Sequence, residues 1–272
     1  LKEFERQNPT VRIESTALSW SDGKTKILLA ANSGTLPDIL NLSLEWVPEF
    51  ASNGLFEPID FVKPDLKPAL DAVQISGHTY AIPFTVNTRA FIVWNNGQEL
   101  NSMNDVIESS LSQSLPLSFP SEEPLTVSKK IIPFFWANNS NVFLSEPFYH
   151  AFNDKAVEAL SQYCNLLNQY GLISTNEEAE ILFLKKKLNG IVTGMWFVNA
   201  LTESKLDNKI KIFDKFPTND TNNPGFSIIS GDCFAITKGK NSETIKKLTS
   251  YLSDYQNIKR FCRKVVDAGF PA

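Results

Sequence analysis

Histidine and cysteine are scarce in this 272-residue chain, which has two histidines and three cysteines. The histidines, His78 and His150, belong to no HExxH pattern, and no GxSxG pattern occurs, so the sequence offers little material for a zinc hydrolase or a histidine-based triad. Cys164, Cys233 and Cys262 lie far apart without CxxC spacing, which argues against a metal cage or a redox pair. We expect no metal and no cofactor, and we expect all three cysteines to be small buried hydrophobes.

Long apolar runs and an excess of basic residues are also missing. No apolar run reaches about 18 residues, so we expect no membrane span, and no signal peptide stands at Leu1. The net charge of −4 argues against nucleic acid or an anionic membrane surface as a partner. Because Leu1 begins in the middle of a helix-then-strand pattern, we expect a further segment before it.

Apolar residues, by contrast, make up 42% of the chain, enough for one large or two ordinary domains. Short apolar runs alternate with segments of helical periodicity, which predicts an α/β fold with parallel sheets between helices and enough elements for two lobes. The stretch 95–114 is polar and broken, and we expect no regular element there. Strands are predicted at 11–14, 39–40, 90–94, 115–119, 190–196, 210–213 and 233–237, a hairpin at 73–83, and helices at 24–31, 155–170, 177–188, 242–252 and 257–266.

The most informative stretch runs from Asn32 to Leu55 as loop, short strand, loop and helix. Ser43 is the expected N-cap of the helix, and Gly54 supplies a left-handed stop. In α/β proteins ligands bind where a strand passes into a helix through a polar loop. Glu45 and Trp46 stand in that opening.

Trp196 occupies a similar position at the end of a strand. An indole there can stack on the apolar face of a sugar or on a cation, although half-buried packing is the alternative. Trp46 and Trp20 are candidates by the same argument. Glu45 and Glu123, each at a helix entry, can accept hydrogen bonds from hydroxyls or bind a cation, although an acid in a first turn often only offsets the helix dipole.

Several motifs follow one another along nearly the whole chain. They are FERQNP at 4–9, SGTLPDI at 33–39, FASNGL at 50–55, GHTYAIP at 77–83, IVWN at 92–95, GIVTGMW at 190–196 and GFPA at 269–272. In this order they resemble the signature of ABC-transporter extracellular solute-binding proteins of the maltose-binding, family 1 sugar-binding type.

The resemblance implies an α/β, two-lobed periplasmic-binding-protein (Venus flytrap) fold in which each lobe is a sheet flanked by helices. Lobe one would comprise 1–86 and 229–272, and lobe two 87–228, with hinge crossings near 86–90 and 217–230. The resemblance further implies a monomer without enzymatic activity that docks on the permease subunits of an ABC transporter. Its place would be periplasmic or extracellular, with a lipid anchor in the segment before Leu1 as one option.

Binding positions of the family carry over to eight residues: Leu42, Glu45, Trp46, Asn87, Glu123, Trp196, Gly231 and Asp232. Leu42 and Leu125 stand where maltose binders have a tryptophan and a tyrosine, so two stacking platforms are missing. We therefore expect a small sugar or glycoside rather than a long maltodextrin. A polyamine or osmolyte on the same fold, a ligand-sensing accessory protein of a receptor and a glycosidase remain as alternatives.

Overall fold

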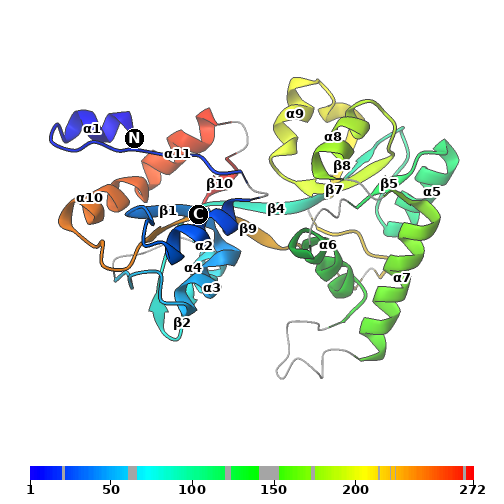
Figure 1. Cartoon of the computed structure of the whole chain (residues 1–272). Helices are drawn as coiled ribbons and strands as arrows, with labels where there is room; N and C mark the ends of the chain where they lie inside the picture. The colour runs from blue at the N-terminus through cyan, green and yellow to red at the C-terminus, as the bar shows by residue number, and fades with distance from the viewer. Residues whose placement is uncertain are drawn as a thin grey trace. The chain divides into compact units, whose positions relative to one another are not determined.

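A computed structural model describes residues 1–19, 22–60, 66–119, 124–140, 153–172, 175–213, 215–220, 222–223, 225–265 and 268–272. These residues form two compact units, which are labelled by element in Figure 1. Unit one comprises Leu1–Asn87 and Ile229–Ala272, and unit two comprises Thr88–Ile228. Strand β4, Ile82–Trp94, carries the chain from unit one into unit two.

The core of unit one lies on one face of strands β1 (Ile39–Ser43) and β9 (Ile229–Ile236), which pair antiparallel. The register places Leu42 opposite Cys233 and Leu40 opposite Ala235, and all four side chains are buried in one cluster. Because alternate residues of a strand point to opposite faces, this buried set fixes the register. The helices whose side chains join this cluster are α2 (Gly23–Asn32), α3 (Val47–Ser52) and α4 (Lys67–Asp71).

On the opposite face of β9, Phe234 forms an aromatic row with Phe84 of β4 and with Phe261. The ring centroids of Phe84 and Phe234 lie 4.7 Å apart, and those of Phe84 and Phe261 lie 4.9 Å apart. Ser242 is the N-cap of the helix that begins at Glu243, as predicted, because its hydroxyl accepts the Ile245 N–H. The elements on this side are α10 (Glu243–Leu252), α11 (Tyr255–Lys264) and β10 (Phe270–Pro271), and the remaining elements of the unit are α1 (Lys2–Gln7), η1 (Leu44–Trp46), β2 (Gln74–Ile75) and β3 (His78–Thr79).

Unit two places its sheet between two hydrophobic clusters. Phe91 and Val93 of β4 face one cluster, and Ala90, Ile92 and Trp94 face the other. The first cluster also contains residues of α5 (Met103–Gln113), α6 (Pro124–Ala137) and α7 (Asp154–Tyr170), and the second contains residues of α8 (Asn176–Leu184) and α9 (Phe197–Glu203). The other strands of this unit are β5 (Leu117–Ser118), β6 (Gly171–Leu172), β7 (Gly190–Gly194) and β8 (Ile210–Phe213), and η3 (Asp207–Lys209) precedes β8. Of these, β7 and β8 lie directly beside β4.

The prediction of parallel sheets is wrong for most pairs of strands. β4 pairs antiparallel with β7 and β8, and β1 pairs antiparallel with β9. The short strand β5 makes parallel pairs with β6 and β7. The alternation of strands and helices does not reveal which strands become neighbours.

The predicted strand at residues 11–14 is also wrong, because residues 11–19 form an extended segment that belongs to no strand. A strand requires a neighbour to complete its hydrogen-bond ladder. In the described part of the chain β1 pairs only with β9, and an open pocket lies between β1 and this segment.

The stretch 95–114 contains a helix that the prediction omitted. α5 begins with a capping box, in which the Ser102 hydroxyl accepts the Asp105 N–H and the Asp105 carboxylate accepts the Ser102 N–H. Met103 and Val106 are buried, whereas much of the rest of the helix is polar. The Ser-x-x-Asp spacing at 102–105 was the available signal for this helix.

The three cysteines do not share one environment, so the expectation that all are buried is wrong. Cys233 is buried, Cys262 is half-buried and Cys164 is exposed, and all three are free thiols. Cys164 occupies a polar position of the amphipathic helix α7, where the apolar stripe consists of other residues.

Candidate functional site

Glu45 lies where β1 passes into η1, and this is the place in the fold that the sequence predicted for it. The Ser230 hydroxyl donates to Glu45 Oε1 at 2.6 Å, and the Ser43 hydroxyl donates to Oε2. Ser43 therefore orients this carboxylate and makes no side-chain cap of the helix, which corrects its predicted role. A carboxylate with two fixed donors is an acceptor in a defined place.

Asp232 lies on the neighbouring strand at the same end of the sheet. It is opposite Ser43 in the ladder, and the Thr85 hydroxyl donates to Asp232 Oδ2 at 3.2 Å. Burial raises the pKa of the Cys233 thiol well above its usual value, and the negative charges of Asp232 and Glu45 raise it further. Unit one thus brings two of the predicted ligand residues, Glu45 and Asp232, to one place. Together they can accept hydrogen bonds from hydroxyls or bind a cationic group.

Gly231 and Asn87 lie where backbone segments approach closely. A Cβ on Gly231 would stand 2.0 Å from the carbonyl oxygen of Thr85, so only glycine permits this packing of β9 against β4. Asn87 is half-buried beside the Gly269 turn, where a Cβ would lie 2.6 Å from Asn87 Nδ2. The Oδ1 atom of Asn87 is buried and accepts no hydrogen bond from the described residues.

Leu42 and Trp46 have different surroundings although they are close in sequence. Leu42 is 2% exposed and packs in the core of unit one, so its observed role is structural. Trp46 is half-buried, and its ring contacts Phe50 edge-on with centroids 6.5 Å apart. Of the two, Trp46 has the exposed surface that a ligand contact requires.

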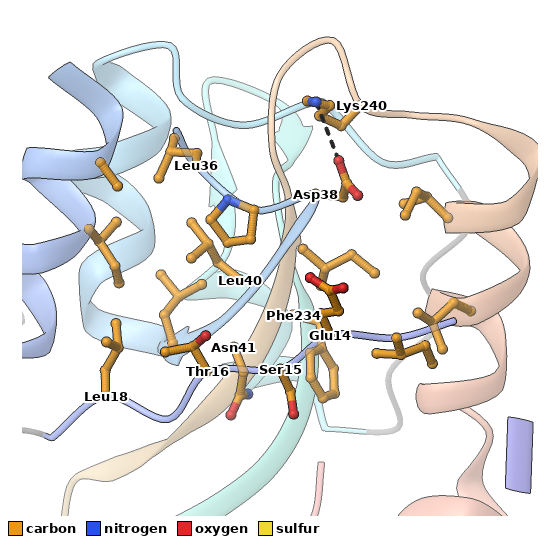
Figure 2. A pocket seen from close by; sticks show the side chains of 18 of the residues that line it. Glu14, Ser15, Thr16, Leu18, Leu36, Asp38, Leu40, Asn41, Phe234 and Lys240 are labelled. Carbon is orange, nitrogen blue, oxygen red and sulfur yellow. Dashed lines mark ion pairs between the residues drawn. The ribbon is translucent and has the colours of Figure 1, made fainter. Parts of the chain in front are cut away.

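Unit one also contains a pocket of about 1530 Å³ that the sequence did not predict. Figure 2 labels Leu40 and Asn41 of β1 and Ser15 and Thr16 of the extended segment among the residues that line it. Trp46 and Asp232 contribute to the lining, and the Asp38–Lys240 ion pair, 3.4 Å long, lies at the rim.

Trp196 lies in unit two, between the end of β7 and the start of α9. Its Nε1–H donates to Glu180 Oε1 at 3.0 Å, and the Thr193 hydroxyl donates to the same oxygen at 2.5 Å. The guanidinium carbon of Arg89 lies 4.6 Å from the centre of the Trp196 ring. The ring is therefore fixed in position and stacked with a cation before any ligand binds.

Gly194 is required for this arrangement. A Cβ at Gly194 would lie 1.8 Å from Cζ3 of Trp196, so the indole rests on the bare backbone of β7. Arg89 is the ladder partner of Gly194 on β4. Sequence reasoning identified Trp196 but missed Glu180 and Arg89, because their proximity arises from the packing of α8 and the pairing of β4.

Two predicted ligand residues, Trp20 and Glu123, lie outside the described residues. In the ranges that are described, no group of three or more His, Cys, Asp or Glu side chains is arranged to hold a metal ion. Nor does that part of the chain include a helix of the length and apolarity needed to cross a bilayer.

Comparisons with known proteins place the chain among binding proteins. Residues 1–272 match the family model described as bacterial extracellular solute-binding protein. A maltotriose-binding protein from Pyrococcus abyssi is 32% identical over 97 residues, which are 34% of this chain and 21% of that protein. Other curated relatives match 92% of this chain at 20% identity, and the chain spans 66% of their length.

Solved structures show the same fold. An ABC-transporter solute-binding protein from Thermotoga lettingae, bound with α-D-tagatose, superposes with a TM-score of 0.80 at 15% identity, covering 99% of this chain and 76% of that one. The GacH receptor of Streptomyces glaucescens, studied with acarbose, gives a TM-score of 0.80 at 16% identity and coverages of 99% and 75%. The predicted α/β periplasmic-binding-protein fold and the motif resemblance are both confirmed. The chain belongs to the bacterial extracellular solute-binding protein family, whose members bind solutes and are not enzymes.

Proposed function

We propose that the chain binds a small sugar or glycoside and delivers it to an ABC importer. The observation that carries this proposal is the fixed indole of Trp196, which Glu180 holds by its N–H and Arg89 covers in part. An aromatic ring that is oriented in advance loses little entropy on binding. The C–H face of a sugar ring is a suitable partner for the part of the ring that remains accessible.

The carboxylates of unit one are polar groups that a sugar can also use. Glu45 and Asp232 accept hydrogen bonds from serine and threonine hydroxyls, the same chemistry as a sugar hydroxyl. A solute hydroxyl can replace Ser230 or Thr85 as donor without leaving a carboxylate unpaired. In this proposal unit one and unit two are the lobes of a Venus flytrap, with Asn87 beside the first crossing.

Delivery of the solute to the importer depends on a change between an open and a closed state of the protein. A solute that contacts both lobes favours the closed state by its differential affinity for that state. The closed monomer then docks on the permease subunits, and the site of action is periplasmic or extracellular. The relatives named above support a sugar, since one is named for maltotriose and one structure contains α-D-tagatose.

A cationic solute such as a polyamine is the second candidate. The proximity of Glu45 and Asp232 at one end of the sheet favours it, because two carboxylates can pair with two ammonium groups. Arg89 next to Trp196 argues against it, since a cation already occupies that part of the indole.

A thermal-shift screen distinguishes the two. Monosaccharides, disaccharides, trisaccharides, glycosides, polyols and polyamines are each added to the native chain, and a ligand of the folded state raises the melting temperature. A shift with a sugar or glycoside supports the proposal. A shift with spermidine alone would replace it with the second candidate.

A further inference from the structure

One end of the unit-two sheet is rich in lysine. β4 runs antiparallel to both β7 and β8, so these two strands begin where β4 ends. Backbone hydrogen bonds of 2.8 Å join the three segments there, from the Trp94 N–H to the Asn189 carbonyl oxygen and from the Asn95 N–H to the Lys209 carbonyl oxygen. We call the exposed lysines of this place the basic end: Lys185, Lys186 and Lys187 before β7, and Lys205, Lys209 and Lys211 before and within β8.

Two of these lysines follow helices in a conformation that glycine usually adopts. Lys186 follows α8 and Lys205 follows α9, and each has φ +54°. In each case the N–H of the next residue bonds back to a carbonyl oxygen of the helix. A lysine near a helix C-terminus also offsets the helix dipole. This role does not account for Lys211, which lies on a strand.

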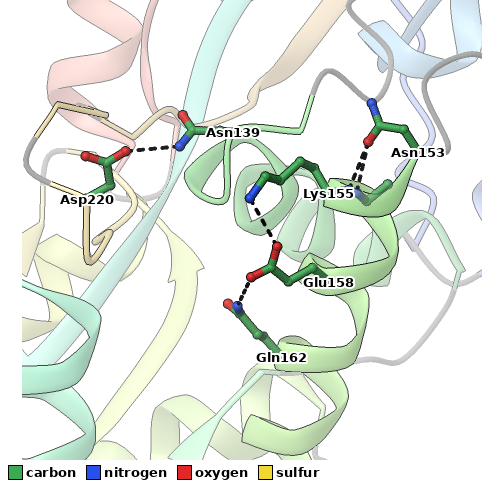
Figure 3. Close-up of polar contacts among 7 residues, drawn as sticks. Asn139, Asn153, Lys155, Glu158, Gln162 and Asp220 are labelled. Atoms are coloured by element: carbon green, nitrogen blue, oxygen red, sulfur yellow. Dashed lines mark hydrogen bonds and ion pairs between the residues drawn. The ribbon is translucent and has the colours of Figure 1, made fainter.

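The positive charges of the basic end are not neutralised by neighbouring acids. Within the ranges that the structure describes, none of the six lysines forms an ion pair with a carboxylate. On α7 of the same unit, by contrast, Lys155 pairs with Glu158 at 3.2 Å, as Figure 3 shows. The net charge of −4 therefore conceals a positive surface, although it predicted no attraction to an anionic membrane. The acids on the connections at this end number half the lysines: Glu99, Glu203 and Asp207.

The side chains of the basic end favour a surface of distributed negative charge over a nucleic acid. The cationic residues there are lysines, and no arginine stands among them to hold a phosphate through two N–H groups. Lys186 Nζ lies 5.0 Å from the centre of the Trp94 ring, and Lys211 Nζ lies 5.6 Å from that of Phe213. These rings are 4% and 8% exposed, so a nucleic-acid base cannot stack on them.

The basic end is separate from the Trp196 indole. β7 begins at Gly190, beside the basic end, and ends at Gly194, on which the Trp196 ring rests. A strand of this length spans about 13 Å between its first and last Cα atoms. A partner at the basic end can therefore bind while the indole stays accessible to a solute.

We infer that the basic end of unit two binds the surface of an anionic phospholipid membrane. Charge complementarity carries the inference, because unpaired lysine ammonium groups are attracted to lipid phosphates and each contributes about fivefold in affinity near the surface. The contact is reversible and depends on salt, since it involves no insertion into the hydrocarbon. It goes beyond the proposed function, because it requires no solute.

Co-sedimentation with vesicles tests the membrane contact. The probes are vesicles of phosphatidylcholine alone and vesicles of phosphatidylcholine with an equal amount of phosphatidylglycerol. At low salt we expect wild type to bind the anionic vesicles at least about tenfold more tightly than the neutral ones. In about 0.5 M salt, where the Debye length falls to about 4 Å, this preference should disappear.

Charge variants assign the contact to the basic end. Replacement of Lys186, Lys209 and Lys211 together by Gln should weaken binding to anionic vesicles at least about tenfold, and replacement of the same three by Arg should preserve it. The matched control removes three lysines that form exposed ion pairs elsewhere and should bind as wild type does: Lys24→Gln, Lys67→Gln and Lys155→Gln combined. Melting curves establish that each variant is folded.

Several outcomes would overturn the inference. Equal binding of wild type to anionic and neutral vesicles would refute it without recourse to any variant. Equal losses in the basic-end and control variants would refute the assignment to this surface. Capture of wild type by single-stranded DNA or polyglutamate, with no binding to anionic vesicles, would replace the membrane with a different polyanion. Saccharide titrations of the same proteins test the proposed function separately, because none of the substituted lysines belongs to the proposed solute site.

Discussion

The indole N–H of Trp196 donates a 3.0 Å hydrogen bond to the carboxylate of Glu180, which lies 16 residues earlier on a different element. The same carboxylate oxygen also accepts the Thr193 hydroxyl. Glu180 therefore links helix α8, strand β7 and the aromatic ring that we place in the site. This acceptor helps to fix the position of the ring, and the first prediction follows from it.

Glu180→Ala should release the Trp196 ring and leave two donors without their acceptor. Loss of a hydrogen-bond partner of this kind costs about 1–3 kcal/mol of unfolding free energy. We also expect weaker saccharide binding, because the ring is no longer oriented. Urea denaturation and calorimetry measure the two effects. Glu180→Gln retains an acceptor oxygen and is the matched control, and equal behaviour of the two variants would contradict the assignment.

Gly194→Ala should displace the indole, because the added Cβ would lie 1.8 Å from Cζ3 of Trp196. Overpacking of this kind costs about 1–3 kcal/mol. The same substitution in a Trp196→Ala background should cost much less, since the clashing ring is gone. A double-mutant cycle by chemical denaturation tests this coupling. Additive effects would show that the ring does not rest on Gly194.

Glu45→Gln and Asp232→Asn should each weaken sugar binding by about tenfold, because a charged acceptor forms the stronger hydrogen bond with a hydroxyl. Calorimetry with the best saccharide of the screen measures the loss. Asp38→Asn is the control, since that carboxylate lies at the rim of the unit-one pocket in an exposed ion pair with Lys240. Full affinity in both site variants would remove these carboxylates from the site.

The capping box of α5 predicts a pH-dependent contribution to stability. The hydrogen bond from the Asn101 N–H is the largest cause that lowers the pKa of Asp105 below 3.8. A carboxylate whose pKa is lowered in the folded state adds to the free energy of unfolding above pH 3.8. This stabilisation is lost as the pH falls through the pKa of the folded state. Asp105→Asn should therefore lower the melting temperature at pH 7, and the difference from wild type should shrink below about pH 4.

Ser102→Ala removes the hydroxyl that accepts the Asp105 N–H in the capping box. Because this hydroxyl does not titrate, the loss of stability in Ser102→Ala should persist to lower pH. Loss of an N-cap hydroxyl costs about 0.5–2 kcal/mol. Melting curves of both variants between pH 7 and pH 3 provide the comparison. A pH-independent difference for Asp105→Asn would contradict the role of its ionised carboxylate.

The sequence predicted those parts of the fold and site that depend on local order along the chain. Glu45 and Trp196 were found because each follows a strand directly and precedes a helix. Gly54 was identified as a helix stop, and its φ of +70° confirms it. The family was evident because the motifs occur in the same order over nearly the whole chain.

What the sequence missed depends on contacts between distant segments. Glu180 and Arg89 reach Trp196 only through the packing of α8 and the register of β4 with β7. Residues 11–14 have the apolar alternation of a strand, but the ladder that makes a strand needs a neighbour that the described residues do not supply. The hydrogen bonds of Asn223 to Trp136 and Ala137 likewise join residues more than 80 positions apart.

Calorimetric titration of wild type and Trp196→Ala with saccharides tests the central claim most directly. The account predicts that wild type binds at least one sugar or glycoside, and that Trp196→Ala binds it at least about tenfold more weakly while it unfolds cooperatively. Equal affinity of a folded Trp196→Ala variant for that ligand would contradict the account.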